Sequence, residues 1–232
     1  MLARGAWARL LYHTPLWRLF DRMMPTRLTI LAGHCVTDEA ANGDLPADMK
    51  IGAERLERIL RELGRRCEWV TVGDGVARLD AGQSQSMIAL SMDDGYKDGY
   101  TVLLPMLRRI GARATVFLEA RPLEERRVSW SHKYFWMLAN GSSAGDVGRA
   151  YMLRCEDGDT RERLRRVLEE EGDLAYTVKK VFKYHAPRLD RDTQIDALFR
   201  ESGGDEAALC ERIYMGWDDV RALAQGGVEL GG

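Results

Sequence analysis

The sequence predicts an α/β protein built around a parallel sheet. Two short apolar runs, residues 87–92 and 113–118, have the length and composition of buried strands. Between them, residues 103–110 place leucine and isoleucine side chains at helical spacing, and Gly111 follows as a stop signal. A strand, a helix and a second strand in this order form a βαβ unit, which builds parallel sheets or barrels.

Further elements extend this pattern on both sides. Apolar runs predict strands, and leucine spacing with flanking glycines predicts helices. Gly64 is expected to cap the helix that precedes it, and Pro105 predicts a kink or a helix start within residues 103–110. The additional expected elements are a strand at 28–31 ending near Gly33, a helix at 52–64, a strand at 68–72, a short helix within 73–83, a helix at 217–225 and a strand beginning at 228–230.

The composition excludes several classes of protein. The chain has 232 residues, with 34 Lys and Arg against 36 Asp and Glu, so its net charge of -2 argues against a general nucleic-acid binder. Hydrophobic residues make up 45%, enough for a core, but no run approaches a membrane-spanning length. The four cysteines are scattered, which predicts packing residues in a reducing compartment; they are Cys35, Cys67, Cys155 and Cys210.

Residues 1–27 form a basic amphipathic extension with tryptophans, leucines and arginines interleaved. Arg9 and His13 interrupt its only apolar run, so no clear signal peptide is present and a cytoplasmic location is expected. Two interpretations remain open. The favoured one is a helix packed on the domain, and the alternative is peripheral contact with an anionic membrane surface.

Residues 121–212 are long, charged and helical by pattern, and we interpret them as an insertion into the α/β unit that spans 28–232. Asp190 and Asp192 are expected to cap a helix there. His132 lies in an aromatic-rich stretch, which favours a place in the core over a sugar-stacking surface.

The most informative motif is Asp93-Asp94-Gly95, which directly follows the apolar run at 87–92. Carboxylates at the end of a buried parallel strand face the edge where α/β enzymes keep their active sites. Gly95 permits a sharp turn that directs both carboxylates to one pocket, where one binds a metal and the other acts as a base. The alternative is a solvated turn in which an aspartate caps the next helix.

The surrounding sequence resembles the polysaccharide deacetylases, the NodB-homology domain of carbohydrate esterase family 4. Their first motif is a strand ending in Thr/Ser-Phe-Asp-Asp-Gly, similar to residues 88–95 here with Met92 in place of Phe. Segments 104–107 and 111–118 resemble the helix and strand that follow that motif, and 28–36 resembles an early strand with a histidine turn. Residues 214–232 resemble the lead-in to the second motif, so the likeness covers roughly 27–120 and 213–232.

The resemblance implies a distorted (β/α) barrel, incomplete here, that carries a helical insertion. It implies metal-dependent removal of acetyl groups from an acetylated polysaccharide or amino-sugar glycan. By the same resemblance Asp93 is the catalytic base and Asp94 a ligand of a divalent metal, most simply zinc. Gly95 and Tyr96 are possible pocket residues, and His34 is either a pocket residue or a structural histidine with one ring nitrogen bonded to the backbone.

The family's histidine ligands follow a strand like the one that begins at 228, and no matching histidine pair is present in this chain. We therefore expect the chain to correspond to the N-terminal portion of a deacetylase, inactive by itself. The alternative is a non-catalytic relative that binds a glycan or a partner. The sequence names neither the glycan nor an oligomeric state.

Overall fold

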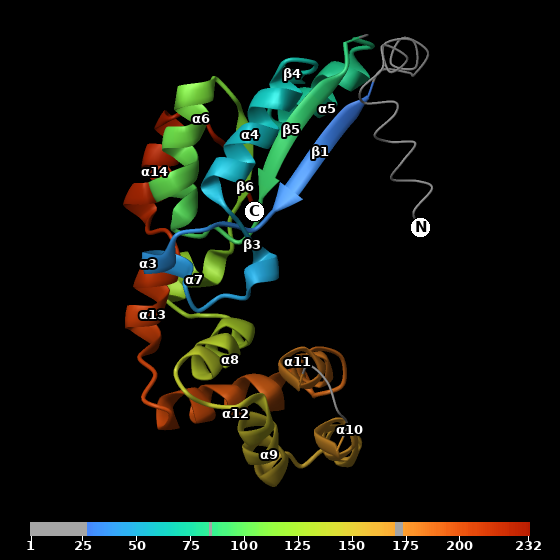
Figure 1. The fold of residues 1–232 in the computed structure, drawn as a ribbon, viewed down its shortest axis with the longest axis vertical. Coiled ribbons are helices and arrows are strands. Elements are labelled where there is room, and N and C mark those ends of the chain that lie inside the picture. The colour runs from blue at the N-terminus through green and yellow to red at the C-terminus, as the bar shows by residue number, and fades with distance from the viewer. Residues whose placement is uncertain (1–26, 84, 170–173) are drawn as a thin grey trace.

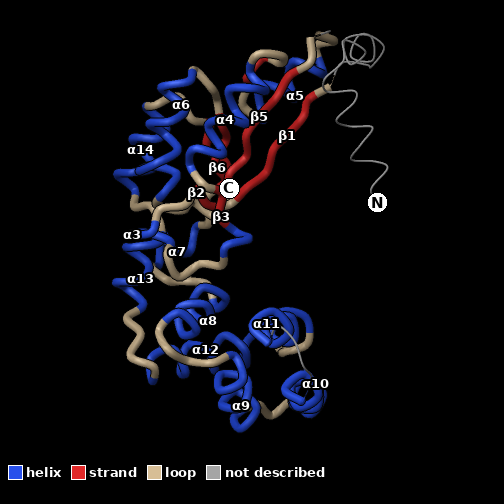
Figure 2. Tube along the Cα trace, viewed as in Figure 1, coloured by secondary structure: helices blue, strands red, loops and turns tan. Residues whose placement is uncertain are grey.

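The computed structural model describes residues 27–83, 85–169 and 174–232. It shows a mixed α/β protein with a five-stranded parallel sheet (Figure 1 and Figure 2). The basic segment expected over residues 1–27 lies outside the described residues, except for Arg27. The sheet strands are β1 Leu28–Gly33, β4 Glu68–Trp69, β5 Met87–Met92, β6 Ala114–Phe117 and β7 Glu229–Gly231.

Strand β5 is the centre of the sheet. β1 pairs with it along its whole length, from Leu28 opposite Met87 to Gly33 opposite Met92. β4 pairs with the first two residues of β5 and β6 with the last three, so these two strands share its other edge. β7 pairs with β6, and the path through the described strands runs β1-β5-β6-β7. The barrel implied by the resemblance stays a prediction.

Helices cover both faces of this sheet. Side chains along β5 alternate between the two faces, and apolar side chains lie on each face. Met87 and Ala89 pack with apolar residues of α5. Leu90 and Met92 point to the opposite face and pack with α4, α6 and α14. Every residue of β5 is buried, which explains why its sequence is apolar except for Ser91. These helices are α4 Ala53–Gly64, α5 Val72–Asp80, α6 Leu104–Ile110 and α14 Trp217–Gln225.

Pro105 begins a helix, which is one of the two outcomes that the sequence predicts. A π-helical turn, η2 Gly99–Leu103, leads into α6, and Pro105 lies in the first turn of α6. Proline has no N–H to donate, so it suits a helix start and not a helix interior. Gly111 ends α6 with φ +67, a left-handed conformation in which glycine is not strained.

Two boundary predictions are wrong. Gly64 lies inside α4, and the cap is Arg65 with a right-handed φ of −74. A Cβ at Gly64 would stand 2.5 Å from the Trp69 indole nitrogen, so this glycine makes room for a side chain. The strand expected at 68–72 ends at Trp69, because the Thr71 hydroxyl accepts a hydrogen bond from a backbone N–H and caps α5.

The described residues between 120 and 213 form seven helices, and α8 to α12 gather at one end of the molecule, beyond the arrowheads of β1 and β5 (Figure 1). Asp190 and Asp192 lie inside α12, which follows Pro187, so their prediction as caps is wrong. The helices are α7 Ala120–Glu125, α8 Trp130–Ala139, α9 Ala144–Arg154, α10 Gly158–Glu169, α11 Leu174–Tyr184, α12 Arg188–Glu201 and α13 Glu206–Ile213.

The short elements between β1 and α4 complete the fold. Strands β2 and β3 pair in parallel as a separate two-stranded sheet. Within the described residues no helix is both long and apolar enough to cross a membrane. The bounds are β2 Cys35–Val36, α3 Glu39–Asn42, a 3-10 turn η1 Ala47–Met49 and β3 Lys50–Ile51.

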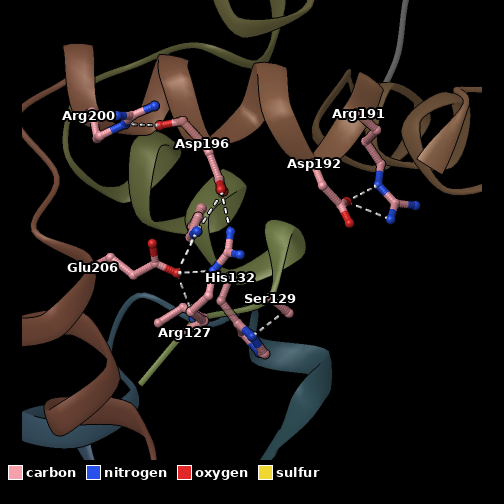
Figure 3. Close-up of polar contacts among 10 residues, drawn as sticks. Arg127, Ser129, His132, Arg191, Asp192, Asp196, Arg200 and Glu206 are labelled. Atoms are coloured by element: carbon pink, nitrogen blue, oxygen red, sulfur yellow. Dashed lines mark hydrogen bonds and ion pairs between the residues drawn. The ribbon is translucent and has the colours of Figure 1, made fainter. Parts of the chain in front are cut away.

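A buried lysine ties three of the helices together. The Lys133 side chain on α8 is 1% exposed, and its ammonium contacts carboxylates of Asp196 on α12 and Glu206 on α13, the latter at 2.7 Å. Arg127 contacts the same two carboxylates, as Figure 3 shows. Each charge therefore has an opposite partner, which a buried charge needs.

Candidate functional site

The Asp-Asp-Gly motif lies where the sequence predicts it, at the carboxyl end of the central strand β5. Asp94 and Gly95 both adopt left-handed conformations, with φ of +69 and +73. A side chain at Gly95 would meet Leu118 at 3.0 Å, so the turn needs glycine for both conformation and space. Left-handed backbone at Asp94 is uncommon for a residue with a Cβ, and such strain often occurs at functional sites.

The two aspartates take different surroundings. The Asp93 N–H donates to the Gly33 carbonyl at 3.0 Å, which continues the pairing with β1. The Asp93 carboxylate accepts a hydrogen bond from the Ser91 hydroxyl at 3.3 Å. Asp94 instead accepts from the Tyr96 hydroxyl at 3.0 Å.

Asp94 is the end of a hydrogen-bonded chain that begins in the helical segment. The Tyr96 hydroxyl contacts His132 Nε2 at 2.7 Å. On the other side of the ring, His132 Nδ1 lies 2.7 Å from the Ser129 hydroxyl and 2.8 Å from the Tyr214 hydroxyl. Figure 3 shows the Ser129 and His132 side chains facing each other at the start of α8.

The proton positions in this series of hydrogen bonds follow from its last acceptor, the Asp94 carboxylate. Because an ionised Asp94 only accepts, Tyr96 donates to it, and the Tyr96 oxygen must then accept from His132 Nε2–H. This assigns the Nε2–H tautomer and leaves Nδ1 as an acceptor for Ser129 or Tyr214. Nδ1 has one lone pair and accepts one of these two protons, and the Ser129 hydroxyl also lies 2.9 Å from the Ser131 hydroxyl. The network fixes the Asp94 carboxylate from one side.

The His132 ring that contacts Ser129 is neutral. Burial lowers the pKa of His132 to about 3, far below its usual 6.5. The geometry places its Nε2 on the Tyr96 hydroxyl that donates to Asp94. His132 is a positioning residue for Tyr96 and, through it, for Asp94.

The turn that carries His34 is held by a second buried acid. Asp98 is 1% exposed and accepts a hydrogen bond from the Val36 N–H. Its other oxygen, Oδ1, has no hydrogen-bond partner among the residues that the structure describes. Burial raises the pKa of Asp98 to about 6. The hydrogen bond between the Val36 N–H and Asp98 joins the β1–β2 turn to the segment that follows Gly95.

A cavity of about 690 Å³ lies between this edge of the sheet and helices α8, α11 and α12. Asp94, Tyr96 and the exposed His34 line it from the sheet side, and Ser129 and His132 line it from α8. Asp93 is not among its lining residues. The structure therefore brings together three of the predicted site residues and does not direct both carboxylates into one cavity.

The zinc site that the resemblance implies needs more ligands than the described residues bring together. A catalytic zinc usually takes three protein ligands. Within residues 27–83, 85–169 and 174–232, no three His, Cys, Asp or Glu side chains lie close enough to hold a metal ion. Asp94 is available as one ligand, but the described residues do not fit a complete zinc site.

Sequence reasoning missed the functional relevance of three residues. His132 was expected in the core, and it is 4% exposed, but it also lines the cavity and supports Asp94. Tyr214 and Asp98 carried no expected role. The Tyr96–His132 and His132–Tyr214 contacts span 36 and 82 residues, so no local pattern could reveal them.

Comparisons with known proteins give limited likeness. No protein-family model and no curated protein match the chain. A de-N-acetylase structure from Aggregatibacter actinomycetemcomitans is 19% identical with a TM-score of 0.36, covering 48% of this chain and 51% of its own length. The Streptococcus pyogenes deacetylase PplD, solved with acetate, is 14% identical with a TM-score of 0.39, covering 68% and 81%. The chain thus spans about half the length of the first structure.

Proposed function

We propose that this chain is a hydrolase of the polysaccharide deacetylase type, which removes acetyl groups from an acetylated glycan, with its parallel sheet forming part of a (β/α) barrel. The observation that carries the proposal is Asp94 at the carboxyl end of β5, in a left-handed conformation, supported by Tyr96 and facing a large cavity. The motif resemblance adds the reaction class.

In this proposal Asp93 is the general base. A half-buried carboxylate can take a proton from water as the water attacks the acetyl carbonyl. The proton passes from Asp93 to the sugar nitrogen or oxygen as its bond to the carbonyl carbon breaks, which gives acetate and the free amine or hydroxyl. The Ser91 hydroxyl holds one Asp93 oxygen, which leaves the other for water.

Asp94 is proposed as a ligand of a divalent metal, most simply zinc, with its carboxylate oriented by Tyr96. Outer hydrogen bonds of this kind are typical of carboxylates that ligate metals. Any further ligands lie outside the set that the described residues bring together.

A second candidate function is glycan binding without turnover. The specific observation that favours it is the absence of a three-ligand cluster among the described residues. A binding protein would still use the cavity and its aromatic and charged lining.

Acetate release separates the two candidates. The protein is incubated, with zinc in excess, with an N-acetylglucosamine tetramer and with an O-acetylated galacturonate tetramer, and acetate is followed by proton NMR. In contrast to the inactivity expected from the sequence alone, the proposal predicts that excess zinc fills a weak site and that acetate is released from at least one tetramer. Binding of a tetramer by calorimetry with no acetate from either one would reject hydrolysis and support the second candidate.

A further inference from the structure

Charged side chains line the cavity on the side of the sheet and on the side of the helices. Asp94, Glu119 and Arg121 lie on the sheet side, and the pKa of Glu119 is raised by burial and by the negative charge of Asp94 and lowered by Arg121. Lys179, Lys183 and Arg188 lie on α11 and α12. Three cations thus face the cavity from the helices, away from the proposed reaction centre.

Arg191, another cation of the lining, already has partners within the protein. Arg191 contacts the Asp192 carboxylate at 2.6 Å, and its guanidinium lies 4.5 Å from the centre of the Trp130 ring. Figure 3 shows this pair on α12, apart from the Asp196 and Glu206 contacts. Arg191 is thus neutralised and held within the protein.

The other cations of the lining differ in this respect. Among the described residues, none of Arg121, Lys179, Lys183 and Arg188 has an ion-pair partner within 4.0 Å. On α10, by contrast, Arg163, Arg165 and Arg166 all contact carboxylates of the same helix. Other described cations without an ion pair, such as Arg55, Arg58 and Arg161, lie elsewhere on the protein, but four of them line this one cavity.

Lys179 is the most constrained of these cations. It is half-buried, and its ammonium lies 4.4 Å from the centre of the Phe135 ring. Burial lowers its pKa, the nearby Lys183 adds to this, and Asp48 is the acid that opposes it. A partly desolvated cation without a contacting carboxylate is unfavourable in the free protein, and an anionic ligand would offset this cost.

We propose that the substrate is an acidic glycan, whose carboxylate or phosphate groups bind at Lys179, Lys183 and Arg188 while an acetylated sugar lies at Asp94. The acidic character rests on the cavity charges, and the glycan part rests on the proposed function. Ammonium and guanidinium groups both bind carboxylate and phosphate.

The test measures binding directly. Calorimetry compares a galacturonate tetramer and N-acetylglucosamine 6-phosphate, as carboxylate and phosphate probes, with a neutral N-acetylglucosamine tetramer. At least one acidic probe binds more tightly than the neutral tetramer, and its Kd rises with salt because ions screen the contacts. The tighter acidic probe identifies the group that is recognised.

The variants Lys183→Gln and Arg188→Gln remove exposed cations, so they leave the fold intact. Each raises the Kd of the acidic probe about two- to fivefold, the range of partly exposed ion pairs. Lys180→Gln is the matched control, because Lys180 is an exposed lysine on α11 that does not line the cavity. Its Kd stays close to that of the wild type.

Three results would overturn the inference. The first is that the neutral tetramer binds as tightly as the acidic probes. The second is that Lys180→Gln raises the Kd of the acidic probe as much as Lys183→Gln and Arg188→Gln do. The third is that a thymidine octanucleotide binds as tightly as the acidic probe and that Lys183→Gln and Arg188→Gln abolish its binding. Failure of the proposed function looks different. A protein that binds the acidic tetramer through these cations, yet releases no acetate from the acetylated tetramers, keeps the inference and loses the hydrolysis.

Discussion

The hydroxyl of Tyr96 donates a hydrogen bond to Asp94 Oδ2 at 3.0 Å, and this bond joins the sheet edge to the helical segment. Tyr96 comes from the loop after β5, but its ring stacks on Tyr214, with ring centres 5.4 Å apart, and its oxygen contacts His132 on α8. Residues far apart in the chain thus orient one carboxylate. The helical segment therefore supports Asp94 through Tyr96, in addition to packing on the sheet.

Removing the Tyr96 hydroxyl should weaken both the reaction and the fold. In Tyr96→Phe the Asp94 carboxylate loses its donor, and we expect kcat for acetate release to fall about tenfold to a hundredfold. His132 Nε2–H loses its acceptor, which costs about 1–3 kcal/mol of stability. Steady-state acetate release and urea unfolding measure the two effects. Tyr184→Phe, at an exposed tyrosine, is the control, and unchanged kcat in Tyr96→Phe would contradict the role of Tyr96.

Asp98→Asn should stabilise the protein at neutral pH. The pKa of Asp98 is about 6 in the folded protein and 3.8 as the ordinary value, so above pH 6 the folded state holds a charge that burial disfavours. The difference corresponds to about 3 kcal/mol, and we expect a gain of about 1–3 kcal/mol at pH 7. Between pH 6 and 3.8 the folded wild type binds the extra proton, so the gain shrinks as pH falls.

Urea unfolding of the wild type and Asp98→Asn at a series of pH values measures this gain. The exposed Asp80→Asn serves as the control for loss of a negative charge. A gain that stayed constant from pH 7.5 to 4 would show that the Asp98 carboxyl does not titrate as its burial requires.

Lys133→Met should destabilise the helical segment. The ammonium is the shared partner of Asp196 and Glu206, and the substitution leaves only the half-exposed Arg127 to balance both carboxylates. We expect a loss of about 3 kcal/mol, at the low end for a broken buried pair because Arg127 remains. Thermal and urea unfolding measure the loss, with Lys180→Gln as control. A change under about 0.5 kcal/mol, typical of surface sites, would contradict it.

Zinc should bind this chain weakly. The described residues offer Asp94 but no cluster of three ligands, and zinc sites of high affinity need a full set. Calorimetric titration with zinc should give no tight site. A single tight site that disappears in Asp94→Ala would show that the ligand set is complete in a way that the described residues do not reveal.

The sequence predicted the α/β core because local patterns determine it. The apolar run of β5, the Pro105 start and the Gly111 stop of α6 each act within a few residues. The same run placed Asp93 and Asp94 at the carboxyl end of a parallel strand. Local signals could not tell that Asp94 lines the cavity and Asp93 does not, because that depends on the left-handed backbone at Asp94.

Other features depend on contacts that are distant in sequence. Gly64 carries the signal of a helix cap, yet it is a glycine because the Trp69 side chain lies against it. His132 has the aromatic neighbours of a core residue, and it is buried, but its contacts with Tyr96 and Tyr214 form only when α8 packs on the sheet edge. Hydrophobic periodicity predicts which residues are buried, but it does not predict which polar groups form hydrogen bonds in the interior.

The central claim is that Asp93 acts as a base at the carboxyl end of β5, and Asp93→Asn tests it most directly. Asparagine keeps the shape of the side chain but takes no proton, so acetate release should fall by at least about a hundredfold while binding of the glycan tetramer is unchanged. Asp80→Asn should keep the wild-type rate. Acetate release by Asp93→Asn at the wild-type rate would contradict the account.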